Sequence, residues 1–532
     1  MYAIFQGGGA RGIAHVGAIA ALETDDIEFA GVGGSSAGAI VAALKAVGYS
    51  STDMFNCEDG SNILSRIDLN HGKVTSAIKP ATGPRDLFGG VGWFAIMAAK
   101  FLWRYRMWVI SLWAGLWVAL LIASHFSPNR NFLFLFASQT VIAFIGVLWV
   151  MYGLAKLDRF VSGLEQILSQ KVSVNDGEPV TFEDLKKSDC LPLRIVASNI
   201  SDGKEEVFSA ETSPNISVAE AVAASVCVPF VFRVRTIDEK CYFDGGLVSN
   251  LPAWVFDEER MLDSEAMTAT IEVSAEPANE VGVKKGFYAI KSAISTAFFG
   301  RATLEKRAVP NLHGIRLEPS VRMLDFDMSV DLARAEIELA TTECTLRLLT
   351  QIVSIPAQME EICEQISGDA LEIINEWRVI EGSQPLSEPP RVAILRPPMG
   401  TTNTLKIDYS HGFMGFTDSG ISLPIDSSIA GFALTKDKPF FANRGHDDWN
   451  ASLHRPQDRA LKHRIRDELE WILAIPFTHL GVGEKRLILA LDGQQSLCED
   501  RATLTELLQE LSFEVRNLLQ EFVPVEVFQD GN

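Results

Sequence analysis

Two glycine-rich turns near the N-terminus have the residue types and spacing of an acyl-transfer site. The second of them, Gly34-Ser35-Ser36-Ala37-Gly38, has the G-x-S-x-G spacing. This spacing predicts a serine on a sharp strand-to-helix turn, with its hydroxyl exposed to a substrate. Ser36 is the candidate nucleophile rather than Ser35, because only Ser36 has a glycine two residues away on both sides.

The first turn, Gly7-Gly8-Gly9-Ala10-Arg11-Gly12, follows the apolar run Tyr2–Phe5. A glycine-rich turn at the start of a helix directs several backbone N–H groups at one point, which suits an oxyanion. Only 27 residues separate Gly9 from Ser36, so the two turns should belong to adjacent strand–turn–helix units. In an ordinary α/β-hydrolase they lie further apart. A dinucleotide-binding turn is disfavoured, because the glycines do not follow the order G-x-G-x-x-G.

A third motif ends a short apolar strand with an acid and two glycines, Cys241-Tyr242-Phe243-Asp244-Gly245-Gly246. By itself this is a common turn. Together with the two glycine-rich turns and the segment Ala224–Pro229, it makes the chain resemble the patatin-like phospholipase family over about residues 1–320. The set of three motifs in this order is highly specific.

The resemblance implies a three-layer α/β/α hydrolase fold with a serine–aspartate dyad. Ser36 would attack an ester carbonyl, and Asp244 would act as the general base. An exposed aspartate has a pKa of about 3.9 and is a weak base, so the oxyanion donors would matter, at roughly 3 kcal/mol each. A conventional triad through a histidine such as His15 or His313 has little support in the sequence. The implied oxyanion donors are Gly8, Gly9 and Ala10, and the supporting residues are Arg11, Gly34, Gly38, Gly245 and Gly246.

Two long apolar runs lie inside the predicted hydrolase domain, within residues 100–160. Residues 107–126 and 132–154 contain no Lys, Arg, Asp or Glu, and each is long enough to span a bilayer as a helix. They predict an inserted transmembrane hairpin, with buried core helices as the alternative. Basic residues gather outside the pair, which predicts that the catalytic and C-terminal domains face the cytoplasm. We therefore expect an integral membrane protein, in the inner membrane if the protein is bacterial.

The C-terminal part of the chain has a different pattern. Residues 321–385 carry apolar residues at helical spacing and predict a helical connector or dimerising helix, with a helical cap on the core as the alternative. Residues 386–532 contain recurring strand-like runs and a final amphipathic helix over about Ala502–Phe522. Three segments resemble a GAF domain: Pro424–Ala433, Trp471–Phe477 and Leu487–Asp492. This weaker resemblance implies an α+β regulatory domain that binds a small-molecule or protein effector, or that forms a homo-oligomer.

Composition excludes several classes of function. The formal net charge of −21 argues against a nucleic-acid partner. Seven cysteines without a C-x-x-C pair suggest reduced thiols, and we expect no metal and no cofactor. The chain begins directly with its first strand, which predicts no cleavable signal peptide. The predicted function is a membrane-anchored phospholipase of the A type acting on membrane phospholipids. The alternatives are an acyltransferase with the same dyad and a non-enzymatic lipid-sensing scaffold.

Overall fold

The computed structural model describes most of the chain, which divides into two compact units, residues 1–348 (unit 1) and 349–532 (unit 2). The described residues are 1–104, 152–273, 312–348 and 355–523, together with isolated positions between these ranges. Within the ranges the structure does not describe residues 25–26, 70–79, 82, 176, 264–265, 398–402, 414–417, 419–420, 446–448, 450–451, 454, 466–467, 479–486 and 498–500.

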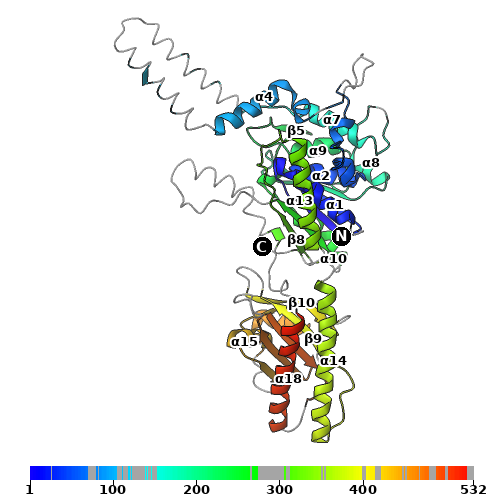
Figure 1. The fold of residues 1–532 in the computed structure, drawn as a ribbon, viewed down its shortest axis with the longest axis vertical. Coiled ribbons are helices and arrows are strands. Elements are labelled where there is room, and N and C mark those ends of the chain that lie inside the picture. Colours follow the sequence, from blue (N-terminus) through cyan, green and yellow to red (C-terminus); the bar gives the residue numbers. More distant parts are fainter. Residues whose placement is uncertain are drawn as a thin grey trace. The chain divides into compact units, whose positions relative to one another are not determined.

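Unit 1 is built around an eight-stranded mixed sheet with the order β5-β6-β3-β2-β1-β7-β8, in which β4 also pairs with β3 (Figure 1). Strands β3, β2, β1, β7 and β8 run parallel, and β4, β5 and β6 pair antiparallel. The bounds are β1 (Tyr2–Phe5), β2 (Gly31–Ser35), β3 (Leu193–Asn199), β4 (Lys204–Phe208), β5 (Arg235–Ile237), β6 (Lys240–Phe243), β7 (Thr268–Val273) and β8 (Leu312–Leu317).

Helices cover one face of this sheet, and an irregular helical segment covers the other. On the first face lie α1 (Ile13–Thr24), α2 (Ala37–Ala46) and α9 (Val218–Ser225), with α13 (Val330–Leu348) packed against α1. On the second face, Leu251, Val255 and Phe256 pack against Ile4 and Val196. The sequence prediction of an α/β hydrolase core is confirmed.

The remaining helices of unit 1 lie in the connections between the strands. They are α3 (Ser51–Met54), α4 (Pro84–Arg104), α7 (Asp158–Leu168), α8 (Phe182–Lys187), α10 (Asp257–Leu262), and the 3-10 helices η1 (Gly9–Gly12), η2 (Ile63–Arg66), η3 (Gly245–Leu247) and η4 (Ala253–Phe256).

The contact between α1 and α13 depends on a glycine. A Cβ atom at Gly17 would lie 2.4 Å from the carbonyl oxygen of Ile337 and 2.8 Å from the Cβ of Ala340. The two helices therefore pack more closely than a larger residue at position 17 would allow. Helix α13, which sequence periodicity left open as a core cap or a connector, belongs to the core of unit 1.

Unit 2 is an antiparallel six-stranded sheet with the order β11-β10-β9-β14-β13-β12. Its strands alternate between two cores: Val392 and Ile394 point to the side of α14 and α18, and Ala393 and Leu395 point to the side of α15. The bounds are α14 (Ile355–Glu381), β9 (Arg391–Arg396), β10 (Thr404–His411), β11 (Ser422–Pro424), α15 (Ile429–Lys436), β12 (Phe440–Asn443), η6 (Pro456–Asp458), α17 (Arg459–Lys462), β13 (Trp471–Phe477), β14 (Leu487–Gly493) and α18 (Arg501–Phe522).

The sequence prediction of an integral membrane protein is contradicted. Among the described residues, no helix combines the length and the apolar composition needed to cross a bilayer. The charged side chains of α13, α14 and α18 lie along their whole lengths, and α4 is interrupted at Gly89, where φ is 71°. Of the two predicted spans, 107–126 and 132–154, most positions lie outside the described residues.

Candidate active site

Ser36 lies on the turn between β2 and α2, as the G-x-S-x-G spacing predicts. Its φ of 52° and ψ of −124° place it in a backbone region that residues with a Cβ rarely adopt. Strain of this kind is often found at functional sites. The Ser36 Oγ donates a hydrogen bond of 2.7 Å to Oδ2 of Asp244, so the fold brings together two predicted residues that are 208 positions apart in sequence.

Asp244 follows β6 and lies almost completely buried, with 1% of its surface exposed. Its second carboxylate oxygen, Oδ1, accepts the backbone N–H of Gly246 at 2.8 Å. The Asp244 backbone is fixed on both sides, because its N–H donates to the Cys227 carbonyl and its carbonyl accepts from Ser198 Oγ. The carboxylate therefore has one orientation, with one oxygen toward the serine.

Burial raises the pKa of Asp244 to about 7, against two hydrogen bonds that lower it, from Ser36 and from Gly246. Among the described residues, no Lys or Arg pairs with this carboxylate. Without a nearby cation, desolvation of the charged form is the largest effect. The weak base expected of an exposed aspartate is thus a stronger base here, with a pKa close to neutral pH.

Glycines of the serine turn and of the aspartate turn lie where other backbone atoms approach closely. A Cβ at Gly38 would lie 2.0 Å from the carbonyl oxygen of Phe5, and a Cβ at Gly34 would lie 2.5 Å from the Gly38 carbonyl carbon. At Gly245 it would lie 2.0 Å from the Val196 carbonyl oxygen. Any side chain at these positions would move the serine or the aspartate turn.

The first glycine-rich turn lies beside the serine turn, because β1 and β2 pair in parallel. Gly9 has a φ of 60°. Among the described residues, no acceptor faces the N–H groups of Gly8 and Gly9. The N–H of Ala10, in contrast, donates to the carbonyl of Met323 at 2.9 Å, so this implied donor already has a partner in the structure.

Arg11 and His15 lie behind this turn. The buried Arg11 Nε donates to the Val321 carbonyl at 3.3 Å, which ties the turn to the segment before α13. His15 Nε2 lies 2.8 Å from the Gln6 carbonyl oxygen, and burial lowers the pKa of His15 to about 4. A neutral, buried histidine hydrogen-bonded to backbone is a packing residue. His313 lies on β8, opposite Ala269 of β7.

Two further residues position the site and were not assigned a role from sequence. Ser225, at the end of α9, accepts the backbone N–H of Ser36 at 2.8 Å and donates to the Val196 carbonyl at 2.6 Å. Asn250 accepts the N–H of Gly7 with its carbonyl and donates from Nδ2 to the Gly7 carbonyl. Their signal in the sequence was proximity to the recognised motifs, because Ser225 lies in the 224–229 segment and Asn250 follows the aspartate turn.

Parts of this chain are similar to curated proteins. The uncharacterized protein YqhO of Bacillus subtilis is 26% identical over 270 residues, which is 48% of this chain and 67% of YqhO. The probable lipid hydrolase 463L of Invertebrate iridescent virus 6 is 29% identical over 73 residues, which is 14% of this chain and 25% of the viral protein. Matches with viral relatives span only 25% to 35% of those proteins.

The C-terminal part is similar to a GAF domain of known structure. The solved GAF domain of A. aeolicus nlh2 aligns with 31% of this chain and 96% of that domain, at 16% identity and a TM-score of 0.19. For the N-terminal part, the family model of patatin-like phospholipases matches residues 3–257, a range that contains both glycine-rich turns and the aspartate turn. Residues 3–257 of the chain therefore match the patatin-like phospholipase family.

Proposed function

We propose that unit 1 is a serine acyl hydrolase in which Ser36 and Asp244 form the catalytic pair. The observation that carries the proposal is the 2.7 Å hydrogen bond from Ser36 Oγ to a carboxylate that is buried without a cationic partner among the described residues. A buried carboxylate with its pKa raised to about 7 accepts a proton more readily than an exposed one, since a base works best when its pKa lies near the working pH.

The proposed reaction proceeds through an acyl-enzyme. As Ser36 Oγ attacks the ester carbonyl carbon, its proton passes to Asp244 Oδ2 and the carbonyl oxygen becomes an oxyanion. The carbonyl re-forms when the bond to the alcohol oxygen breaks, and Asp244 returns its proton to that oxygen. Water then attacks the acyl-enzyme, giving its proton to Asp244. The proton returns to Ser36 as the carboxylic acid leaves.

The N–H groups of Gly8 and Gly9 would stabilise the oxyanion in both steps. Removing one such donor costs an enzyme about 3 kcal/mol of transition-state stabilisation. An oxyanion hole with two N–H donors is consistent with a serine–aspartate dyad. Asp244 takes up the serine proton, so the negative charge on the substrate carbonyl oxygen needs other hydrogen-bond donors. Asn250 and Arg11 would keep the turn in the conformation that presents these amides.

We propose a lipid ester as the substrate class, on the basis of the match of residues 3–257 to the family. We also propose that residues 386–532 regulate the reaction. Such regulation requires that an effector bind the active and resting states with different affinities. Removing residues 386–532 should therefore change the rate of lipid hydrolysis, and equal rates with and without these residues would contradict a regulatory role.

The catalytic assignment is tested by comparing two adjacent serines. We expect Ser36→Ala to lower ester hydrolysis by at least about 10⁴-fold, as for other nucleophile deletions. Ser35→Ala is the matched control: Ser35 Oγ is buried and has no hydrogen-bond partner among the described residues, so its loss should leave the rate within about twofold.

A fluorophosphonate probe should label the wild type and Ser35→Ala, but not Ser36→Ala. Both variants should keep the wild-type circular dichroism spectrum. Labelling that persists in Ser36→Ala, or is lost in Ser35→Ala with the fold intact, would overturn the assignment of Ser36.

A further inference from the structure

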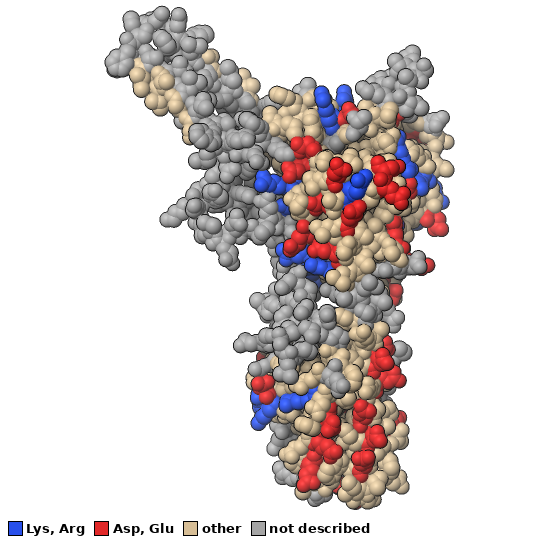
Figure 2. Space-filling view, in the orientation of Figure 1, with Lys and Arg blue, Asp and Glu red and all other residues tan. Residues whose placement is uncertain are grey.

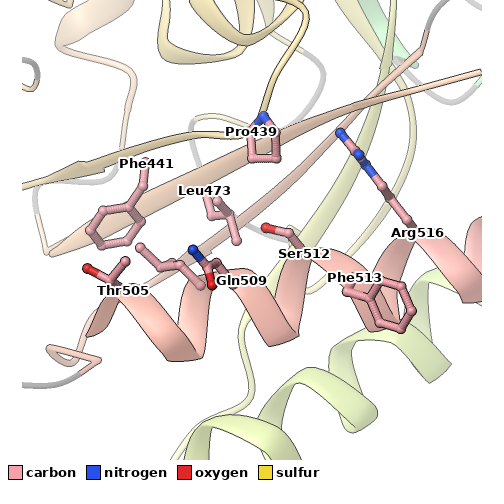
Figure 3. A pocket seen from close by; sticks show the side chains of 9 residues that line it. Pro439, Phe441, Leu473, Thr505, Gln509, Ser512, Phe513 and Arg516 are labelled. Carbon is pink, nitrogen blue, oxygen red and sulfur yellow. The ribbon is translucent and has the colours of Figure 1, made fainter. Parts of the chain in front are cut away.

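Unit 2 contains a groove on the side of its sheet that carries α18. The groove has a volume of about 390 Å³, which lies within the range of about 300–1,000 Å³ found for small-molecule sites. Figure 3 shows it running along α18, with Phe441 and Thr505 at one end and Phe513 and Arg516 at the other. The lining residues are Pro439, Phe441, Leu473, Thr505, Leu508, Gln509, Ser512, Phe513 and Arg516.

The walls of the groove are mainly apolar. Phe441 belongs to β12, the last strand of the sheet order, and Leu473 to the neighbouring β13. Leu508 and Phe513 come from α18. Phe513 is 62% exposed, and a large exposed aromatic residue beside an apolar hollow is typical of a binding surface. An occupant would therefore gain its binding energy mainly from apolar contact.

Among the described residues that line the groove, Arg516 is the only charged one. Its Nη2 donates a long hydrogen bond of 3.4 Å to the Pro476 carbonyl, and no Asp or Glu among the described residues forms a salt bridge with it. The guanidinium thus keeps donors for an anion, which it can bind through two parallel hydrogen bonds.

The surroundings of Arg516 select against simple anions. Glu506, Glu510 and Glu514 lie exposed on the same helix, and Figure 2 shows acidic side chains gathered over the part of unit 2 where α14 and α18 are seen. A small polar anion would meet repulsion from these carboxylates and find only one partly exposed cation. An anion with a long apolar tail would add contact along the whole groove.

We propose that this groove binds a long-chain carboxylic acid, with its carboxylate on Arg516 and its alkyl chain along Phe513, Leu508 and Phe441. This ligand is the class of product that the proposed hydrolysis of lipid esters releases, so the choice of its source rests on the proposed function. The groove would then report accumulated product to the C-terminal unit. Neither the dyad nor the glycine-rich turns contribute to it.

The test uses the full-length chain carrying Ser36→Ala, so that binding is separated from turnover. The probe is hexadecanoic acid with a photoreactive diazirine in its chain, and cross-linked peptides are identified by mass spectrometry. We expect labelling in peptides that contain Phe441, Leu508 or Phe513, competed by unlabelled hexadecanoic acid. The corresponding photoreactive alcohol should label about tenfold more weakly, because it lacks the charge that Arg516 recognises.

Substitutions separate the head group from the tail. Arg516→Gln should remove the preference for the acid over the alcohol, and Arg516→Lys should retain part of it. Lys462→Gln, which removes a positive charge outside the groove, is the matched control and should change nothing. Gln509→Trp should fill the groove and lower labelling about tenfold, whereas Gln520→Trp on the same helix, outside the lining, should not.

Three results would overturn the proposal: no labelling of these peptides, equal labelling by acid and alcohol, or a Gln509→Trp variant that changes the oligomeric state while labelling persists. The last result would assign the groove to a second copy of the chain. Because the assay needs no turnover, its outcome is independent of the dyad. Labelling without any ester hydrolysis by the Ser36-containing chain would refute the proposed function and keep the site.

Discussion

Both units bury aspartate side chains, but what faces the carboxylate differs. In unit 1, Asp244 faces a serine hydroxyl and a backbone N–H, and burial raises its pKa to about 7. In unit 2, Asp418 and Asp492 both face Arg391, with salt bridges of 2.9 and 2.7 Å. Burial of carboxylates thus occurs beside one shared arginine in unit 2 and without a cation among the described residues at Asp244 in unit 1.

The difference separates a structural carboxylate from a reactive one. The Arg391 guanidinium offsets part of the charge that burial would otherwise penalise, and it links its own strand β9 to Asp492 of β14 and to the loop at Asp418. The Asp244 carboxylate lacks that compensation, and its charged form is destabilised in the folded protein. Groups whose charged form is destabilised in this way are found at sites where their reactivity is useful.

The largest expected effect is on the pH dependence of hydrolysis. Asp244 must be deprotonated to accept the Ser36 proton, and its pKa is about 7. We therefore expect kcat/KM to fall about tenfold per pH unit below pH 7 and to level off above it. The measurement is hydrolysis of a soluble short-chain ester between pH 5 and 9. A profile that is flat from pH 5 to 8 would contradict a base of this pKa.

The second prediction concerns stability in unit 1. Because the folded-state pKa of Asp244 is raised from 3.8 to about 7, the folded protein keeps a proton that the unfolded chain has lost between these values. Wild-type stability should therefore decrease as pH rises from about 4 to about 7. Asp244→Asn lacks this loss, so it should be more stable at pH 8, by at most about 4 kcal/mol.

The gain of Asp244→Asn should disappear as the pH approaches 4, which denaturant titrations at several pH values would measure. Asp202→Asn is the control, because the hydrogen bond from Lys240 lowers the pKa of Asp202, and its neutralisation should bring no gain. An Asp244→Asn variant less stable than wild type at pH 8 would show that the carboxylate is held by compensating interactions.

The third prediction concerns the paired aspartates of unit 2. Arg391→Met leaves Asp418 and Asp492 without the guanidinium that they share, so we expect a loss of about 3 kcal/mol, the low end for breaking a buried ion pair. Hydrogen exchange in peptides of β9 and β14 should report it. The exposed pair Arg455–Asp426 is the control, and Asp426→Ala should cost less than about 1 kcal/mol. Equal losses would contradict the contrast between buried and exposed pairs.

The sequence predicted the turns of the site because their requirements are local. Glycines at positions 34 and 38 identify the register of Ser36, since the strained turn admits nothing larger there. The main strands and the final helix of unit 2 also followed from hydrophobic alternation and periodicity. In each case the residues that determine the structure are close in sequence to the element that they form.

Features that depend on distant segments could not be predicted. The pKa of Asp244 comes from burial by β3 and α9, and the Ala10 N–H is paired with Met323, which follows β8. The acid-binding groove joins β12, β13 and α18. Hydropathy alone led to the prediction of an integral membrane protein, which the described helices do not support. Among the described residues, no helix is both long enough and apolar enough to cross a bilayer.

The smallest effect tests whether the backbone of the serine turn needs external support. Ser225 Oγ accepts the Ser36 N–H at 2.8 Å, so Ser225→Ala leaves a buried backbone donor without a partner, at a cost of about 1–3 kcal/mol. We expect the unpaired Ser36 N–H to displace the Ser36 side chain, and kcat to fall about tenfold with little change in KM. Ser225→Thr keeps the hydroxyl and should restore part of the rate.

Ser198→Ala is a parallel test, because Ser198 supports the Asp244 carbonyl rather than the serine turn. It should displace the base, and therefore shift the apparent pKa of the rate profile, whereas Ser225→Ala should leave that pKa unchanged. If Ser225→Ala alters only stability, with kcat and the pH profile as in wild type, the strained turn at Ser36 holds its geometry without this bond.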